Sequence, residues 1–422
     1  MKVTKGPWVW NGQEGNRMKS IIVSVIAFLM VLGNMQMMLA QSPCTSITAY
    51  GGSPKNPDNR AALAAALKAS SGGGKEGQNA YGPVPACVYF PPGVFTFSSN
   101  VTYVLPNGSA SITLIGAGAD VTQLYWPAGG GLTVDYVGTQ NSVHLRNLSL
   151  TTGSINVGSA VVLTQTNGNA GVAGNAISEL FDVAIRGADG YSQNDYWAVG
   201  VQINQISNVN LVGLDIAGPG GAAYSSRGVG LSLQGSNNNP AVIFNVTDST
   251  FTYLSQGIVY GQDVQGVTVS QSNFVGDDYG IYSPPNVGGQ DQLSVLGSQF
   301  NCASAGIYVG SYLVNTLFSA NLFIVPNTGR GIYLQYAFLY SMMGNSFNIG
   351  SPEQGATYPI GIEVGNTVAG GTITGNVFND MATAIVLDAS STGANVQSNS
   401  YSVDSAMVEN LGTGNTVGGG SP

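Results

Sequence analysis

Gly306-Ile307-Tyr308-Val309 is one copy of a pattern that recurs down the second half of the chain. A glycine followed by valine or isoleucine stands at Gly200, Gly228, Gly257, Gly280, Gly306, Gly331 and Gly361, and Ala384-Ile385 is a degenerate eighth copy. Successive copies are 28, 29, 23, 26, 25, 30 and 23 residues apart. Such a period indicates one supersecondary unit stacked on itself, each unit burying the apolar face of its neighbour.

A second marker keeps step with the first. It is an aromatic residue, in most copies preceded by a small polar one: Phe251, Phe274, Phe300, Phe323, Phe347, Phe378 and Tyr401. Each unit therefore holds at least two short strands, separated by turns rich in Gly, Asn, Ser and Asp. The residues around each glycine alternate with period two, which is the period of a strand. The sequence predicts an all-β fold, a single-stranded right-handed parallel β-helix.

Two files of side chains are expected to point into this solenoid and to stack about 4.8 Å apart, the spacing of parallel neighbours. The first file follows the glycine and contains Val201, Val229, Ile258, Ile281, Ile307, Ile332, Ile362 and Ile385. The second lies two residues further on and contains Ile203, Leu231, Tyr260, Ser283, Val309, Leu334, Val364 and Leu387.

The composition excludes several classes of protein. The 422 residues include 60 glycines, 43% are hydrophobic and 8% are charged, which suits a long β-solenoid and argues against disorder. From Glu76 onward there are four arginines and 19 acidic residues, a net charge of −15. Nucleic acid and anionic lipid are therefore unfavourable partners.

Residues 18–40 have the features of a secretory signal. Met18-Lys19 precedes an apolar run at 21–32, and Met38-Leu39-Ala40 forms a cleavage site. We expect a secreted protein, extracellular or periplasmic, with no membrane attachment after cleavage; a single transmembrane anchor is the alternative. Export permits a disulfide between Cys44 and Cys87, with free thiols as the alternative.

The residues that follow the leader are predicted to cap the solenoid. A short strand-like stretch at 47–52 precedes a helix expected at 58–69, with Asp58 as its N-cap. We expect four segments: a leader at 1–40, the cap and first coils at 41–125, the parallel β-helix at 126–410 and a flexible, glycine-rich tail at 411–422.

This N-terminal order resembles the start of pectate-lyase-like β-helix proteins, especially the rhamnogalacturonase-like and glycoside hydrolase family 28-related groups. The resemblance rests on the helix, on VYFPPG at 88–93 and on the turn Ile115-Gly116-Ala117-Gly118. It implies a β-helix with a capping helix that acts on polysaccharide along one outer face. The same cap fronts lyases, hydrolases, epimerases and phage tailspikes, so it is specific for the fold rather than for an activity.

One outward column is a candidate sugar-binding strip. Between the two inward files it holds Gln202, Gly230, Val259, Tyr282, Tyr308, Tyr333, Glu363 and Val386. Consecutive tyrosines can stack on sugar rings and donate hydrogen bonds; a ladder that only stabilises the strands is the alternative. A further aromatic group, expected to extend this surface toward the N-terminal side, contains Tyr196, Trp197, Tyr224 and Tyr253.

Charged residues just before the repeated glycines are the candidate catalytic groups. Arg227 and Arg330 are placed in one register, each two coils from the acid pair Asp277-Asp278. Such arginines could hold a uronic acid polymer, and paired carboxylates could split into an acid and a base. Solvated turns that carry compensating charges are the alternative.

The segment Gly276–Ile281 (GDDYGI) resembles the G-D-D-x-x-[IV] signature of glycoside hydrolase family 28, but the resemblance stops there. The family's upstream acidic site would fall at 255–258, where there is no carboxylate, and its histidine segment would fall near 303–306, where there is no histidine. Its basic segment is also missing, because no lysine follows Lys75. Only Asp277 and Asp278 are carried over as catalytic candidates.

Two functions stay open on the sequence alone. The first is a secreted lyase or hydrolase that cleaves an acidic or plant-type glycan, and the second is a non-catalytic adhesin or glycan-binding protein. No cofactor is expected, and Ca²⁺, held by Asp263, Asp277 and Asp278, is an alternative for the lyase. Polysaccharide is the expected partner, and the chain is compatible with a monomer or a trimer.

Overall fold

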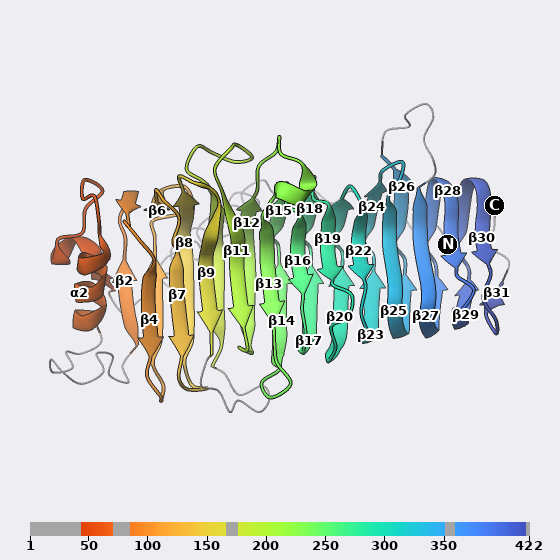
Figure 1. Ribbon diagram of the computed structural model, residues 1–422, viewed down its shortest axis with the longest axis horizontal. Coiled ribbons are helices and arrows are strands. Elements are labelled where there is room, and N and C mark those ends of the chain that lie inside the picture. The colour runs from red at the N-terminus through yellow and green to blue at the C-terminus, as the bar shows by residue number, and fades with distance from the viewer. Residues whose placement is uncertain (1–43, 71–84, 166–175, 351–358, 419–422) are drawn as a thin grey trace, which may run out of the picture. The chain divides into compact units, whose positions relative to one another are not determined.

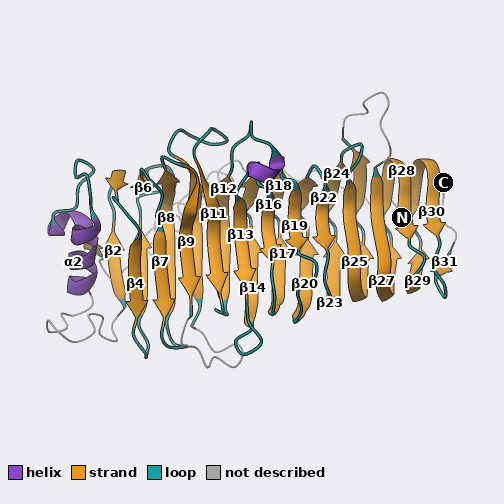
Figure 2. Ribbon diagram, viewed as in Figure 1, coloured by secondary structure: helices purple, strands orange, loops and turns teal. Residues whose placement is uncertain are grey.

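The structure is a computed structural model, and it describes residues 44–70, 85–165, 176–350 and 359–418. The predicted leader at 1–40 lies outside these described residues. From Thr45 onward the chain forms one solenoid of parallel strands, a right-handed parallel β-helix (Figure 1). Each coil contributes strands to three faces, which follow one another along the chain and which we number 1, 2 and 3 (Figure 2).

Most strands belong to a single face. Face 1 contains β4 (Val101–Leu105), β7 (Leu132–Tyr136), β9 (Ile155–Thr164), β11 (Tyr196–Asn204), β13 (Val229–Gln234), β16 (Gln256–Tyr260), β19 (Tyr279–Ser283) and β22 (Ala305–Val309). Face 2 contains β1 (Thr45–Ser46), β2 (Ala86–Tyr89), β5 (Ser111–Ile115), β14 (Ala241–Thr247), β17 (Val264–Ser270), β20 (Gln290–Leu296), β23 (Leu313–Ser319), β29 (Thr392–Gln397) and β31 (Thr416–Val417). Face 3 contains β3 (Gly93–Thr96), β6 (Thr122–Trp126), β15 (Thr250–Thr252), β18 (Asn273–Val275), β21 (Gln299–Asn301), β24 (Leu322–Val325) and β26 (Ser346–Ile349).

The remaining strands bend from one face to the next. Faces 2 and 3 share β8 (Ser142–Thr152), β10 (Ser178–Gly187) and β12 (Val209–Ala217). Faces 1 and 2 share β25 (Arg330–Met343) and β27 (Ile360–Thr374). Faces 3 and 1 share β28 (Val377–Leu387) and β30 (Ser400–Asn410). Two short 3-10 helices, η1 (Ile47–Tyr50) and η2 (Tyr224–Ser226), complete the described elements with α2 (Arg60–Ser70).

The helix α2 covers the N-terminal end of the solenoid, as the sequence predicts. It buries Leu63, Ala66 and Leu67 and packs against β1, β2 and η1. It begins at Arg60, two residues later than expected, and the Asp58 carboxylate accepts a hydrogen bond from the Arg60 backbone N–H at 3.1 Å. No helix in the described part of the chain has the length and apolar character that a membrane crossing requires.

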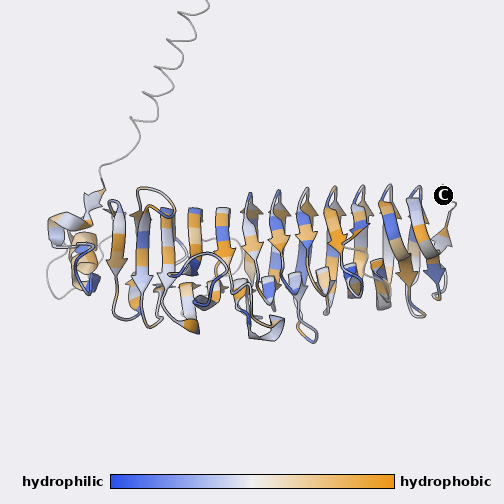
Figure 3. Ribbon diagram, turned by 90° about the horizontal axis from the view of Figure 1, so that it is seen from above, coloured by the Kyte–Doolittle hydropathy of each residue, from blue (hydrophilic) through white to orange (hydrophobic). Residues whose placement is uncertain are grey.

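The inward files have the predicted residues except at one coil. From β16 onward Ile258, Ile281, Ile307, Ile332, Ile362 and Ile385 stand in register. At β13, however, Leu231 and Leu233 occupy the two inward positions, whereas Val229 and Leu231 were predicted. Ser232, and not Gly230, is therefore the outward residue of this coil. Figure 3 shows the resulting alternation of hydrophobic and hydrophilic residues along the strands.

The glycine and the phenylalanine markers are two sides of one contact. The phenylalanine rings stack along the solenoid with centroids 4.8 to 5.0 Å apart from Phe251 to Phe378. A Cβ atom at Gly280 would lie 2.6 Å from the Phe300 ring, and one at Gly306 would lie 2.7 Å from Phe323. The glycine is therefore required because the ring of the same coil occupies the space of its missing side chain.

A buried polar ladder follows the turn from face 2 to face 3. Its members are Ser249, Ser272, Ser298, Asn321, Asn345, Asn376 and Asn399. Each backbone N–H donates to the side-chain oxygen of the member in the next coil, at 2.9 to 3.2 Å. The asparagine side-chain amides donate to the same oxygens, so these buried polar groups are satisfied from coil to coil.

The predicted segments can be compared with the strands. Within the segment predicted as a flexible tail, Thr416–Val417 form β31, which pairs with β29 and extends face 2 by one more strand. The division expected at residue 125 falls inside β6, and the coils continue through it.

Cys44 and Cys87 are both disulfide-bonded, and Cys302 is a buried free thiol.

Candidate functional site

The outward column of face 1 carries three consecutive tyrosines, on β19, β22 and β25. Register places Tyr282 beside Tyr308 and Tyr308 beside Tyr333, with Glu363 next on β27. The first two rings are stacked with centroids 5.2 Å apart, and the third meets Tyr308 edge-on at 5.4 Å. The predicted tyrosine strip is thus present, and we use this name for Tyr282, Tyr308 and Tyr333.

A fourth tyrosine widens the strip. The Tyr279 ring lies 4.9 Å from Tyr282 and 5.6 Å from Tyr308. Tyr279 belongs to the segment Gly276–Ile281 and was not predicted as part of the strip. The sequence contained a signal for this contact, because Tyr279 stands directly before the pair Gly280-Ile281 and Tyr282 stands directly after it.

The strip borders a pocket of about 180 Å³. Its lining residues are Tyr279, Ala303, Ser304, Ala305, Tyr308, Thr328, Arg330 and Tyr333. This volume is below the roughly 300–1,000 Å³ of pockets that enclose a whole small ligand. The pocket therefore suits one unit of an extended ligand that lies along the face.

Arg330 is the charged residue of this pocket, and its charge is already matched. Its guanidinium forms an ion pair with the Glu363 carboxylate and lies over the Tyr333 ring, 4.8 Å from the centroid. Glu363 is 8% exposed, so the pair is held against the protein rather than in bulk water. An arginine bound in this way is not a free clamp for a carboxylated substrate.

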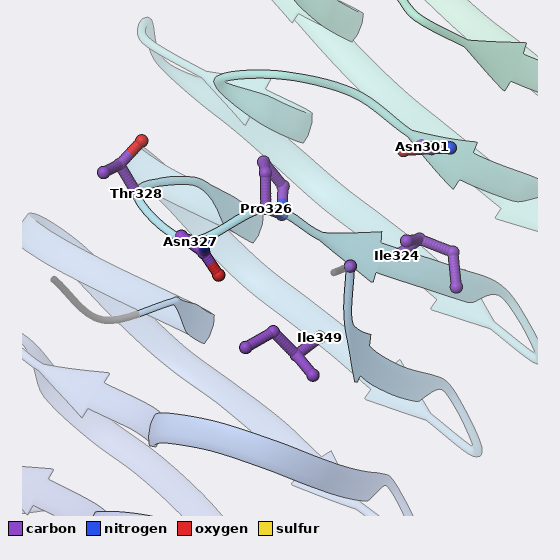
Figure 4. Close-up of a pocket in the computed structure, with 7 residues that line it drawn as sticks. Asn301, Ile324, Pro326, Asn327, Thr328 and Ile349 are labelled. Atoms are coloured by element: carbon purple, nitrogen blue, oxygen red, sulfur yellow. The ribbon is translucent and has the colours of Figure 1, made fainter. Parts of the chain in front are cut away.

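A second hollow, of about 680 Å³, lies on the other side of the turn at 326–329. Its lining residues are Asn301, Ile324, Pro326, Asn327, Thr328, Ile349 and Gly350 (Figure 4). Thr328 borders both hollows. The larger hollow has more room but no ionisable side chain in its lining, so the chemistry is concentrated in the smaller one.

Arg227 is not in register with Arg330, which corrects the sequence prediction. Val229 pairs with Gln256, and this column continues through Tyr279 and Ala305 to Arg330. The Arg227 guanidinium donates to the carbonyl groups of Ala222, Gly220 and Gly276. It also lies over the Tyr224 ring at 4.2 Å. Its donors are therefore used within the protein, where they fix the loop before β13.

The second aromatic group does not form a surface. Tyr196 and Trp197 are 4% and 3% exposed, and the Trp197 indole N–H donates to the Leu150 carbonyl at 3.2 Å. Tyr224 is exposed in η2, and Tyr253 lies in the turn after β15, where it packs beside Arg227. The structure thus places two of these residues in the core and two around Arg227, away from the tyrosine strip.

The acid pair Asp277-Asp278 is split between inside and outside. Asp277 is completely buried, and its carboxylate accepts a hydrogen bond from the Leu254 backbone N–H at 2.7 Å. Burial raises the pKa of Asp277 well above its usual value, against the opposing effects of this bond and of the Arg227 charge. Asp278 is partly exposed and accepts a hydrogen bond from the Ser304 hydroxyl, which lines the pocket. Only Asp278 can approach a ligand.

Another carboxyl group on face 1 was missed. Asp388 follows the end of β28, two residues beyond Val386, which pairs with Glu363. Burial raises the pKa of Asp388; the Arg330 charge opposes this shift and the Glu409 charge adds to it. The alternation with period two along β28 contained a signal for Asp388, because Asp388 lies two residues after Val386, the last member of the outward column.

Among the described residues no three His, Cys, Asp or Glu side chains come together as a metal site. The buried position of Asp277 also separates it from Asp278, so the Ca²⁺ alternative gains no support from this geometry.

Comparison with known proteins identifies the fold. No family model matches the chain, and no curated protein matches its sequence. Among solved structures, the catalytic unit of a thermostable GH87 α-1,3-glucanase from Streptomyces thermodiastaticus has a TM-score of 0.58 and 15% identity, over 90% of this chain and 68% of that one. DFA-IIIase from Arthrobacter chlorophenolicus has a TM-score of 0.56 and 13% identity, over 85% and 97%.

The Dettilon tailspike protein is similar to the same degree, with a TM-score of 0.56 and 13% identity, over 86% of this chain and 68% of that one. At these identities the likeness shows the parallel β-helix fold alone.

Proposed function

We propose that face 1 binds a neutral polysaccharide chain along the solenoid axis and that the protein hydrolyses it outside the cell. The observation that carries this proposal is the tyrosine strip beside a pocket whose arginine is already paired with Glu363. The GH87 glucanase and DFA-IIIase, which share the fold, are by their names enzymes that act on carbohydrates, in keeping with this class of function.

The spacing of the strip suits an extended glycan. Because the rings of Tyr282 and Tyr308 stack on each other, the strip offers a glycan its ring edges and its hydroxyl groups, which can form hydrogen bonds. The Tyr308 hydroxyl already donates to the Gln335 side chain at 2.6 Å, which fixes the orientation of the central ring. Rings on successive strands, about 4.8 Å apart, form a continuous track rather than one isolated stacking site.

The charges favour a neutral glycan over the acidic one expected from the sequence. A uronic acid polymer needs free cations, but Arg227 binds backbone carbonyls and Arg330 binds Glu363. The charge of Glu409, which lies near Asp388 at the C-terminal end of the strip, is also unfavourable for a carboxylated ligand. A lyase also needs a group that neutralises the substrate carboxylate, so these contacts favour hydrolysis over β-elimination.

Affinity electrophoresis against separate gels of α-1,3-glucan, inulin, arabinogalactan and polygalacturonate tests this proposal. We expect binding to a neutral polymer and none to polygalacturonate. Tyr308→Ala should weaken that binding about 2- to 13-fold, since one aromatic contact contributes about 0.5–1.5 kcal/mol. Tyr50→Ala, a change at an exposed tyrosine of the N-terminal cap, is the matched control and should bind like the wild type.

Preferential binding of polygalacturonate, or equal binding by Tyr308→Ala and the wild type, would contradict the proposal. Binding of a neutral glycan without release of any product would point to the non-catalytic alternative, an adhesin or glycan-binding protein.

A further inference from the structure

The reacting groups of this site can be assigned, and the assignment rests on the function proposed above. We propose that Asp388 and Glu363 are the acid and the base that hydrolyse the glycosidic bond at the C-terminal end of the tyrosine strip. The two groups replace the pair Asp277-Asp278 that the sequence suggested.

Register brings the two residues to neighbouring strands on one face. Glu363 stands directly after Tyr333 in the outward column, and Val386 stands opposite Glu363. Alternate residues of a strand share a face, so Asp388 points to the same side as Val386. The Asp388 backbone N–H donates to the Val364 carbonyl at 2.9 Å, which anchors it beside β27.

The separation suits two carboxyl groups that act on opposite sides of one bond. One strand spacing of about 4.8 Å and two residue rises of about 3.3 Å place the two Cα atoms about 8 Å apart. In glycosidases that use an acid, a base and a water molecule, the carboxyl groups themselves lie roughly 6.5–9.5 Å apart, a separation that side chains on Cα atoms at this spacing can reach. Glu363 on β27 and Asp388 at the end of β28 are the carboxyl groups that follow Tyr333 on the next two strands of face 1.

The surroundings of the two groups differ. Arg330 forms an ion pair with Glu363 and holds this carboxylate beside the tyrosine strip. Asp388 is partly buried, and the groups around it are Arg330 and Tyr333 on β25, Glu363 on β27 and Glu409 on β30. Burial and Glu409 together outweigh Arg330 and raise the pKa of Asp388. A carboxyl group with a raised pKa can serve as the acid, and the carboxylate that Arg330 holds on the neighbouring strand can serve as the base.

The reaction is a single displacement by water. The Asp388 carboxyl proton passes to the glycosidic oxygen while the bond between that oxygen and the anomeric carbon breaks. A water oxygen forms the new bond to the anomeric carbon, and its proton passes to the Glu363 carboxylate. One end gains a hydroxyl group, the other becomes a new reducing end, and exchange with solvent then returns both carboxyl groups to their starting states.

The alternative acids are less well placed for this step. Asp277 is completely buried, and Asp278 is joined to Ser304 at the other side of the pocket. Along the strip, Glu363 is the first carboxylate that follows the tyrosines in the same column.

The test measures reducing ends released from the neutral glycan that the full-length protein binds, together with binding itself. Asp388→Asn and Glu363→Gln should each lower the rate about 100-fold or more, the usual effect of losing an acid or a base, while binding persists. The matched controls are Asp291→Asn and Glu179→Gln on face 2, which change the same chemical groups away from the strip. Asp278→Asn, assayed alongside, tests the acid that the sequence favoured.

Asp388→Asn keeps the test decisive if Glu363→Gln unfolds, because Asp388 takes part in no ion pair among the described residues. The wild-type rate should fall as pH rises through the raised pKa of Asp388, because the acid loses its proton, and Asp388→Asn should lack this fall.

Unchanged rates in both folded variants would overturn the assignment, and so would binding by the wild type with no release of reducing ends. The second result would leave glycan binding intact, whereas failure of the wild type to bind any glycan would reject the proposed function itself.

Discussion

The inner and outer sides of the face 1 strands follow different rules. Inside, each coil from β16 to β27 repeats isoleucine after glycine, against the same phenylalanine stack. Outside, the same strands carry valine, three tyrosines and then glutamate. The interior must satisfy the neighbouring coil on both sides, so its residues are constrained to repeat. The exterior has no such partner, and a change there gives the solenoid a local site without changing its coils.

The largest expected effect is on stability, which should depend far more on residues inside the solenoid than on those outside. Phe300→Ala should lower the free energy of unfolding by about 3–5 kcal/mol, because it removes a buried ring from the middle of the stack. Tyr308→Ala removes a partly exposed ring and should cost about 1 kcal/mol or less. Urea unfolding of both variants measures the difference. Equal losses would mean that the tyrosine strip is a stabilising ladder, the alternative that the sequence left open.

A smaller effect distinguishes the roles of Arg227 and Arg330 in stability and in glycan binding. Arg227→Met leaves the carbonyl groups of Ala222, Gly220 and Gly276 without their donor and should lower the free energy of unfolding by about 1–3 kcal/mol. Its glycan affinity should equal that of the wild type. Arg330→Met, measured in the same way, should weaken glycan binding because Arg330 lines the pocket. Loss of binding by a folded Arg227→Met protein would restore the predicted role of Arg227 as a clamp.

The last effect is a difference between two pH profiles of stability. Burial raises the pKa of Asp277, and the Leu254 N–H and the Arg227 charge oppose part of this rise. The folded pKa of Asp277 is raised, so its favourable contribution is complete below the unfolded pKa and is lost as pH rises through the folded one. We expect the melting temperature of Asp277→Asn to fall less between pH 4 and pH 8 than that of the wild type. Parallel curves for the two proteins would contradict this.

The regular interior was the part that the sequence could predict. The spacing from Gly257 to Ala384 located the coils, and the alternation around each glycine assigned the sides of each strand. The prediction was wrong at β13, because either Gly228-Val229 or Gly230-Leu231 could be the start of the repeat in this coil. Stacking of Leu231 on Val201 and Ile258 selects the second start, and this information lies in other coils.

The site was harder to predict, because the role of each charged side chain depends on the groups that it contacts. Arg227 and Arg330 look alike in the sequence, but one binds carbonyl groups of distant turns and the other binds a carboxylate. Likewise, Asp277 and Asp278 are adjacent, yet the bend before β19 sends one inward and the other outward. Long-range contacts decide such assignments, and a single sequence does not contain them explicitly.

The polar ladder between faces 2 and 3 has a direction. Asn321 donates through both its backbone and its side chain to the Asn345 oxygen, and Asn345 donates in the same way to Asn376. Loss of the Asn345 side chain would strip the preceding coil of its acceptor, while the following coil would keep its own oxygen. A substitution at one position of this file therefore removes an acceptor from the coil before it and a donor from the coil after it.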